Sequence, residues 1–217
     1  MENLRRELID TMRAMNARDL NQGKAGNGSF RSEGGFVITP SGVDYQDMNP
    51  SDLIEMDMKG EWEHPGRRRP SSEWRFHRDI YRTRPDVNAI LHTHGRSVTT
   101  LACAGRSIPA FHYMVAVAGG SDIRCAEYAT FGTQELSEQV CQALENRKAC
   151  LLAHHGLVAV GDSLAEALDL VIEVEHLAEV YWRLLSLGEV RTLSDEEMER
   201  VLERFRSGYG DSDSTAS

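Results

Sequence analysis

Cysteine, lysine and long apolar runs are scarce in this chain of 217 residues. The four cysteines form no C-x-x-C pair and match no zinc-finger spacing, which argues against a disulfide scaffold or a structural zinc module. No stretch approaches the roughly 18 uninterrupted apolar residues that cross a bilayer. The charged start, residues 1–6, is not followed by the apolar segment of a secretory signal. These absences predict a reduced, cytoplasmic protein without a membrane partner.

Positive charge is also in short supply. Acidic residues outnumber basic residues 34 to 24, giving a formal net charge of −10. Nucleic-acid binding depends on clustered Lys and Arg side chains, so a nucleic-acid partner is not expected. With 41% hydrophobic and 27% charged residues, the composition is that of a globular protein long enough to bury a core. We expect a single domain over residues 1–207 and a C-terminal tail over 208–217.

Hydrophobic periodicity and turn residues predict an α/β fold. Helices are expected at 1–19, 71–84, 136–144, 163–187 and 194–205, and strands at 36–39, 53–58, 87–94 and 149–160. The Gly-rich segment 23–28 is expected to be either a turn or an anion-binding loop. Because the strands and helices do not alternate strictly, we expect a mixed or antiparallel sheet with helices on its faces.

Two histidines on one predicted strand indicate a metal site. His92 and His94 are two residues apart, so strand alternation places both imidazoles on the same face. Converging imidazoles suit a divalent transition metal. His154 and His155 end a later apolar run, and on a strand they would face opposite sides, so at most one joins the pair. Three histidines would leave one coordination position open, as in catalytic sites, but spacing alone does not choose between His154 and His155.

Ser71, Ser72 and Glu73 stand at the expected start of a helix. Their hydroxyls and the helix N-terminus suit a phosphate, and a plain N-cap is the alternative. Glu73 either complements the helix dipole or acts as a general base if it faces the metal. His77, one turn later on the same helix face, is expected to pack or to support the site rather than to bind the metal. Tyr113 is either a proton donor or a core residue.

Together these motifs resemble the class II aldolase/adducin family, in its bacterial sugar-phosphate aldolase branch. The resemblance rests on seven blocks in the family's order, at 21–27, 38–42, 70–77, 92–94, 108–114, 128–133 and 154–157. It implies a three-layer α/β/α sandwich around a largely antiparallel sheet. It also implies a homotetramer with active sites at the subunit interfaces.

The resemblance further implies a zinc-dependent aldolase that cleaves a ketose 1-phosphate, such as L-fuculose 1-phosphate, into dihydroxyacetone phosphate and an aldehyde. One Zn²⁺ per subunit would be held by His92, His94 and His155. Glu73 would bind the empty metal and then act as the acid/base, and Tyr113 would handle a proton across the interface. The phosphate would lie against Asn27, Ser41, Gly42, Ser71 and Ser72. The aldehyde pocket of a neighbouring site would contain Phe131 and Tyr209.

Other activities on the same fold stay open. A 5-deoxyribulose or methylthioribulose 1-phosphate aldolase would keep every block. A ribulose-5-phosphate 4-epimerase usually has Asp where this chain has Glu73 and lacks the 108–114 block, and a methylthioribulose-phosphate dehydratase departs in the loops. A non-catalytic adducin-like interaction module would have lost the three histidines.

Overall fold

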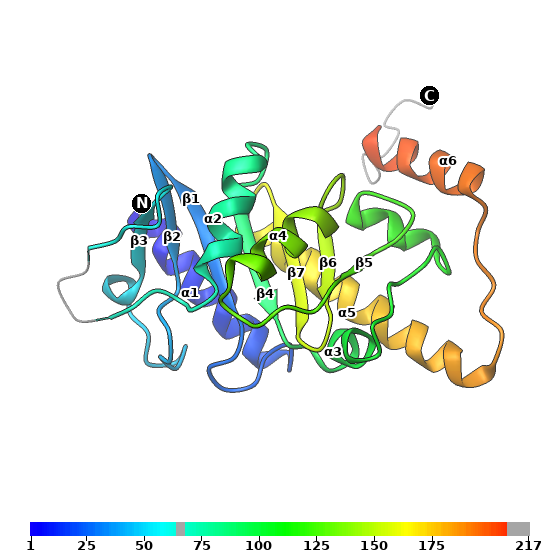
Figure 1. Ribbon diagram of the computed structural model, residues 1–217, viewed down its shortest axis with the longest axis horizontal. Coiled ribbons are helices and arrows are strands. Elements are labelled where there is room, and N and C mark those ends of the chain that lie inside the picture. The colour runs from blue at the N-terminus through cyan, green and yellow to red at the C-terminus, as the bar shows by residue number, and fades with distance from the viewer. Residues whose placement is uncertain (64–67, 208–217) are drawn as a thin grey trace, which may run out of the picture.

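The computed structural model describes residues 1–63 and 68–207, and within these ranges helices surround one seven-stranded sheet (Figure 1). The strands are β1 (Asn27–Ser32), β2 (Gly35–Ile38), β3 (Ile54–Asp57), β4 (Ala89–Thr93), β5 (Arg124–Ala126), β6 (Ala149–Leu152) and β7 (Gly156–Gly161). The α-helices are α1 (Glu2–Ala17), α2 (Trp74–Thr83), α3 (Arg96–Cys103), α4 (Gln134–Ala143), α5 (Leu164–Leu187) and α6 (Asp195–Arg206). Two short 3₁₀ helices are η1 (Pro50–Asp52) and η2 (Tyr113–Ala118).

The strand order is β3-β2-β1-β4-β7-β6-β5. Each neighbouring pair is antiparallel except β5 and β6, which are parallel. The sheet is therefore mixed but largely antiparallel, and the expected α/β class is confirmed. The register places His92 of β4 opposite Asn27 of β1 on one side and Val158 of β7 on the other. Two segments distant in sequence thus flank His92.

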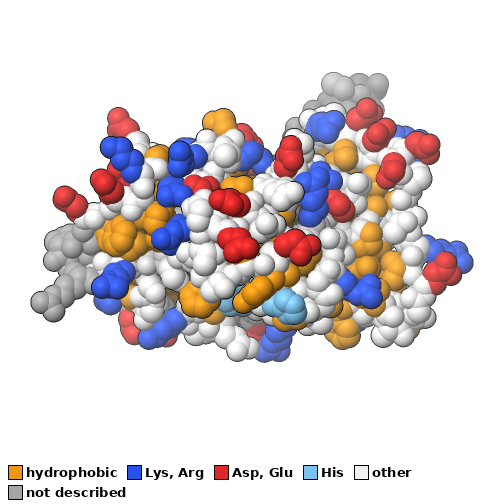
Figure 2. All heavy atoms as spheres, viewed as in Figure 1, with side chains coloured by type: hydrophobic (Ala, Val, Ile, Leu, Met, Phe, Trp, Pro, Cys, Tyr) orange, Lys and Arg blue, Asp and Glu red, His pale blue; other side chains and the backbone are white. Residues whose placement is uncertain are grey.

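Two buried clusters, one on each face of the sheet, make the three layers. Strand alternation sends Ile90 and Val158 to the face covered by α2 and α4, where they pack with Phe76. It sends Leu91 and Ala159 to the opposite face, which α1, α3 and α5 cover. Figure 1 shows α2 and α4 in front of the sheet and α5 behind it. On this front face, acidic and basic side chains are interspersed (Figure 2).

The structure corrects several expected elements. The apolar run 149–160 is two antiparallel strands, β6 and β7, rather than one strand. A turn at 153–155 reverses the chain, and a continuous apolar run carries no period that would mark it. Part of the Gly-rich segment belongs to β1, and α3 and β5 were not expected. The helix expected from residue 71 begins at Trp74, because Ser71 and Ser72 lie in the preceding turn.

Serine side chains cap two of the expected helices. Ser163 and Ser194 cap α5 and α6, and their side chains accept hydrogen bonds from the backbone N–H groups of Glu166 and Glu197. All four cysteines are free thiols. Across the two described ranges, none of the helices combines the length and apolar character needed to cross a membrane. The expected tail, 208–217, lies outside the described residues.

Candidate metal centre

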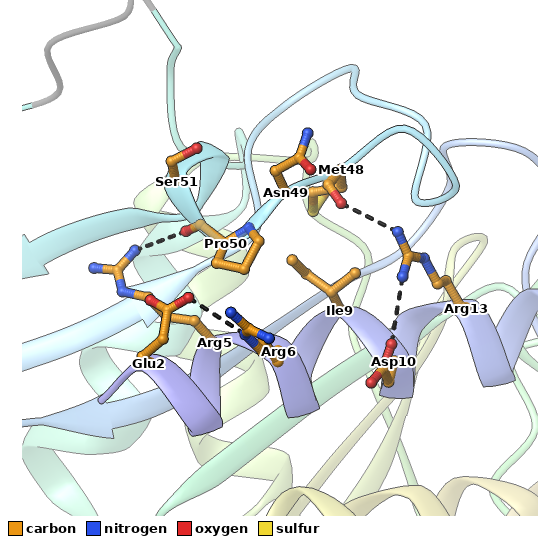
Figure 3. A pocket seen from close by; sticks show the side chains of 10 residues that line it. All are labelled: Glu2, Arg5, Arg6, Ile9, Asp10, Arg13, Met48, Asn49, Pro50 and Ser51. Atoms are coloured by element: carbon orange, nitrogen blue, oxygen red, sulfur yellow. Dashed lines mark hydrogen bonds and ion pairs between the residues drawn. The ribbon is translucent and has the colours of Figure 1, made fainter.

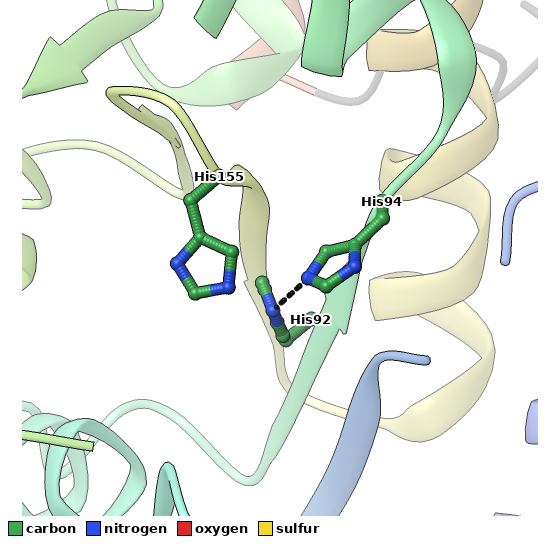
Figure 4. Close-up of side chains that lie close together, drawn as sticks. All are labelled: His92, His94 and His155. Carbon is green, nitrogen blue, oxygen red and sulfur yellow. Dashed lines mark hydrogen bonds between the residues drawn. The ribbon is translucent and has the colours of Figure 1, made fainter. Parts of the chain in front are cut away.

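Three histidines from two neighbouring strands converge at one end of the sheet (Figure 4). His92 lies near the end of β4, His94 follows that strand, and His155 comes from the turn between β6 and β7. Their metal-binding nitrogens all lie within 4.8 Å of one another, and the Nε2 atoms of His92 and His94 are 2.9 Å apart. The three ring centroids are separated by 4.7 to 4.9 Å. This spacing matches a set of nitrogens arranged around one ion.

The turn between β6 and β7 selects His155 rather than His154. His154 has a φ of 56°, which turns it away from the pair, and its exposed ring meets Tyr128 edge-on with centroids 5.8 Å apart. His155 instead faces His92 and His94. The sequence left this choice open because it predicted one continuous strand over 149–160, and strand alternation alone does not say which of the two histidines faces the pair.

Backbone and amide groups hold the histidines in place. His92 Nδ1 donates to the carbonyl of Leu157 at 2.9 Å, which leaves Nε2 free to face the other rings. The backbone N–H of His94 donates to Asn21 Oδ1 at 3.0 Å. Ligands oriented by such contacts are arranged before any ion binds, so little ordering remains to be done on binding.

Glu73 lies beside the three rings at the start of α2. Its Oε2 is 3.2 Å from His92 Nε2, and its Oε1 is 3.3 Å from His155 Nε2. The residue is only 7% exposed, and Oε1 accepts no hydrogen bond from any residue in the described ranges. A buried carboxylate oxygen without a donor is costly. A cation between the carboxylate and the histidines would satisfy it.

Charge and burial set the protonation of these groups. Burial alone would raise the pKa of Glu73, but the nearby charges of His92, His155 and His94 lower it to about 2. Burial and the charge of His92 lower the pKa of His94 to about 3 and that of His155 to about 4. Burial opposes the charged form of His92, yet the adjacent Glu73 raises its pKa. At neutral pH the site therefore offers an ionised carboxylate at Glu73 and neutral imidazoles at His94 and His155, the forms that bind metal.

The donor set fits a catalytic divalent metal. Three imidazole nitrogens are the ligand set of an open tetrahedral site, and the carboxylate oxygen lies within reach of the remaining position. His92, His94 and His155 would hold the ion.

A buried chain of hydrogen bonds leads away from Glu73 into the layer between α2 and the sheet. Asn27 Nδ2 donates to Glu73 Oε2 at 3.0 Å, and Asn27 Oδ1 is 2.6 Å from His77 Nε2. His77 Nδ1 is 2.7 Å from Ser29 Oγ, which is 2.8 Å from the hydroxyl of Tyr81. All five residues are buried. Burial, reinforced by the charge of His92, lowers the pKa of His77 to about 3, so that ring is neutral.

Four of the five expected phosphate residues lie in two segments joined by a β-bridge, with Ser41 and Gly42 in a turn after β2 and with Ser71 and Ser72 directly before α2. Pro40 and Pro70 form an antiparallel bridge, and the backbone N–H of Ser71 donates to the carbonyl of Thr39. On the other side of the bridge, the backbone N–H of Ser41 donates to the carbonyl of Arg69. The fifth residue, Asn27, is buried and directs its amide to Glu73 and His77. The role of all five toward a phosphate stays a prediction.

The expected proton donor Tyr113 and the expected aldehyde-pocket residue Phe131 are both exposed side chains. Tyr113, 41% exposed, begins η2 and lines a groove with Phe111, Val201 and Phe205, next to α6. Phe131 is 65% exposed, in the loop before Gly132 that packs on Ser72. Tyr209 lies outside the described residues. The role of these aromatic residues stays a prediction.

Another groove lies along α1, away from the metal centre (Figure 3). Arg5 donates to the carbonyls of Pro50 and Leu53, and Arg13 donates to backbone carbonyls of the 45–48 segment. These guanidinium groups attach the loop before β3 to α1. We assign this groove a structural role.

Sequence reasoning missed Ser29 and Tyr81. Ser29 belongs to a strand that was not expected. Tyr81 carried a signal, because Glu73, His77 and Tyr81 recur every four residues and therefore form one polar stripe along α2.

The chain is similar to known proteins over most of its length. Residues 6–182 match the family model described as Class II Aldolase and Adducin N-terminal domain. A 5-methylthioribulose-1-phosphate/5-deoxyribulose-1-phosphate aldolase from Rhodospirillum rubrum is 56% identical, over 96% of this chain and 93% of that protein. An L-fuculose phosphate aldolase from Escherichia coli is 50% identical, over 95% of each chain. A solved structure of an L-fuculose 1-phosphate aldolase superimposes with a TM-score of 0.91 at 42% identity, covering 95% of this chain and 97% of the other.

Proposed function

The chain belongs to the class II aldolase and adducin family and is a class II aldolase, and we propose that this lyase uses Zn²⁺ to cleave a ketose 1-phosphate into dihydroxyacetone phosphate and an aldehyde. The observation that carries the proposal is the convergence of three histidines next to a buried carboxylate. Intact metal ligands argue against a non-catalytic adducin-like module. The presence of Glu73 at the acid/base position argues against the epimerase.

The chain's own residues account for proton movement. Zn²⁺, when held by His92, His94 and His155, would act as a Lewis acid toward the substrate oxygens. Breaking the C3–C4 bond requires removal of a proton from the C4 hydroxyl and return of a proton to C3. We assign the first transfer to Tyr113 of a neighbouring subunit and the second to Glu73, which lies against the ligands.

The start of α2 would hold the phosphate. Ser71 and Ser72 directly precede a helix N-terminus, where backbone dipoles and hydroxyl groups favour an anion, and Ser41 and Gly42 would complete the site. Gly42 has a φ of 72°, and a side chain there would meet no atom within 4 Å, so its turn leaves open space around it. Asn27 would contact the substrate from the side of Glu73.

Two substrate types are supported. L-fuculose 1-phosphate is one, because that substrate is named for the 50% and 42% identical relatives. The 56% identical relative favours 5-deoxyribulose 1-phosphate and 5-methylthioribulose 1-phosphate. All share the end that yields dihydroxyacetone phosphate and differ in the aldehyde released, so the aldehyde pocket would decide between them.

We further propose a homotetramer with active sites at subunit interfaces, in the cytoplasm. Exposure of Tyr113 and Phe131 supports an assembly in which a second copy brings these aromatic side chains to the metal. Four free thiols support a reducing compartment.

The test is a coupled assay for dihydroxyacetone phosphate, run on the zinc-loaded protein with all three ketose 1-phosphates in parallel. We expect release from at least one, abolished by verified metal removal and restored by Zn²⁺. Ribulose 5-phosphate serves as the control for epimerisation. Absence of release from all three substrates, or full activity in metal-free protein, would reject the proposal.

A further inference from the structure

The hydrogen-bond chain from Glu73 to Tyr81 has only one direction of donation that satisfies every member. A carboxylate only accepts hydrogen bonds. Asn27 must therefore turn its NH₂ group toward Glu73 Oε2, which leaves its carbonyl oxygen facing His77 Nε2. That nitrogen must carry the proton, since two acceptors 2.6 Å apart would repel each other.

The rest of the chain follows from the same requirement. A neutral imidazole with its proton on Nε2 has a lone pair on Nδ1, so Ser29 donates to it. The oxygen of Ser29 then accepts from the hydroxyl of Tyr81. Burial raises the pKa of Tyr81, so that hydroxyl keeps its proton and remains a donor. Every hydrogen bond in the chain thus points toward the carboxylate.

The opposite tautomer of His77 would disturb the metal centre. With the proton on Nδ1, Nε2 would become an acceptor and the Asn27 amide would rotate to donate to it. Its carbonyl oxygen would then face the carboxylate of Glu73. That carboxylate would lose its donor, and its other oxygen already has none in the described ranges. Glu73 would be pushed from its place beside His92 and His155.

We propose that His77 is a positioning residue that acts through Asn27: its Nε2–H fixes the Asn27 amide so that the NH₂ group holds the Glu73 carboxylate at the metal centre. The inference rests on the proposed aldolase activity. Within the described ranges, His77 forms no hydrogen bond with the metal ligands. Its ring packs on Phe76, with centroids 4.6 Å apart. The ring therefore sets where the acid/base group stands without taking part in the proton transfer itself.

Two substitutions of His77 separate positioning from simple space filling. Gln places an amide nitrogen near the position of Nε2 and can still donate to Asn27, whereas the shorter Asn reaches only the region of Nδ1. We expect His77→Asn to lower kcat by about 10- to 100-fold, the usual effect of losing a group that orients a metal-site residue. KM and the content of one metal per chain should stay unchanged. His77→Gln should recover most of kcat.

Two further variants complete the series. Tyr81→Phe removes only the far hydroxyl and should cause a smaller loss of kcat than His77→Asn. His176→Gln changes an exposed histidine of α5 and should behave as the wild type. A purely structural role for His77 would lower thermal stability in both His77 variants without separating their kcat values.

Nitrogen NMR of wild-type protein labelled at histidine gives a readout that does not depend on activity or on refolding of a variant. We expect His77 to be neutral with its proton on Nε2, in both metal-free and zinc-loaded protein. A proton on Nδ1, or wild-type kcat in a folded His77→Asn variant, would overturn the inference. A zinc-loaded wild type that is inactive on every ketose 1-phosphate would instead reject the proposed function.

Discussion

The two groups of residues assigned to the reaction differ sharply in their surroundings. The metal-binding group, His92, His94, His155 and Glu73, lies at the end of the sheet, and Glu73 is only 7% exposed. The aromatic group, Tyr113 and Phe131, is 41% and 65% exposed. One chain thus arranges the ligands and the carboxylate by itself, whereas these two aromatic side chains are exposed on its surface. From this contrast we expect that a single chain is sufficient to bind the metal, whereas catalysis requires residues from a neighbouring subunit.

The largest expected effect comes from removing a ligand. His155→Ala should abolish both metal binding and release of dihydroxyacetone phosphate, because the ion loses one of its three nitrogen ligands. His154→Ala is the matched control, since its ring faces Tyr128 instead of the ligands. Metal content by elemental analysis and the coupled assay measure both variants. Equal metal loss in both variants would contradict the assignment of His155 to the metal-binding group.

Glu73→Gln should keep one metal per chain and lower kcat by at least ~10²-fold, the low end for a lost general acid/base. Gln preserves the shape but cannot carry the proton. Single-turnover kinetics on metal-loaded protein would measure the loss. Normal kcat in this variant would remove Glu73 from the mechanism.

Tyr113→Phe should retain metal and lose about 10²-fold in kcat, because the substitution removes only a proton-transferring hydroxyl. The comparison also predicts complementation. Mixing inactive His92→Ala and Tyr113→Phe subunits should restore part of the activity, since a hybrid interface pairs an intact metal centre with an intact tyrosine. Activity that never exceeds the sum of the separate variants would place Tyr113 in its own chain's site or outside the reaction.

The expected effect farthest from the reaction is on acid stability. His77 has a folded-state pKa of about 3 against the ordinary value of 6.5, so the unfolded chain binds the proton first as the pH falls. Its contribution to the free energy of unfolding is therefore complete above pH 6.5. It is lost on acidification toward pH 3 at about 1.4 kcal/mol per pH unit. Urea unfolding of metal-free protein between pH 7 and 4 should show a shallower decline for His77→Gln than for the wild type. Parallel curves would show that folding does not lower the pKa of His77.

The fold was predictable where local signals are strong. Hydrophobic periodicity predicted the helices that the structure shows as α1, α5 and α6. The short, polar strand β1 was missed because glycine and asparagine at its start indicate a turn, while pairing with β2 and β4 overrides that preference. The β6–β7 hairpin was missed because both strands are buried on two faces and read as one apolar run.

The metal centre was partly predictable. Spacing on a strand indicated His92 and His94, but the third ligand depended on a turn that only the fold reveals. The link from Glu73 through Asn27 to His77 joins residues 46 and 50 positions apart in sequence. Such contacts follow from strand register, which local sequence does not encode.

The most direct test of the central claim is a zinc titration of metal-stripped protein, with bound metal and dihydroxyacetone phosphate release measured in the same samples. The account predicts that activity on a ketose 1-phosphate rises in proportion to bound zinc and reaches its plateau at one ion per chain. Full activity before any metal binds, or a fully loaded protein that cleaves none of the three ketose 1-phosphates, would contradict it.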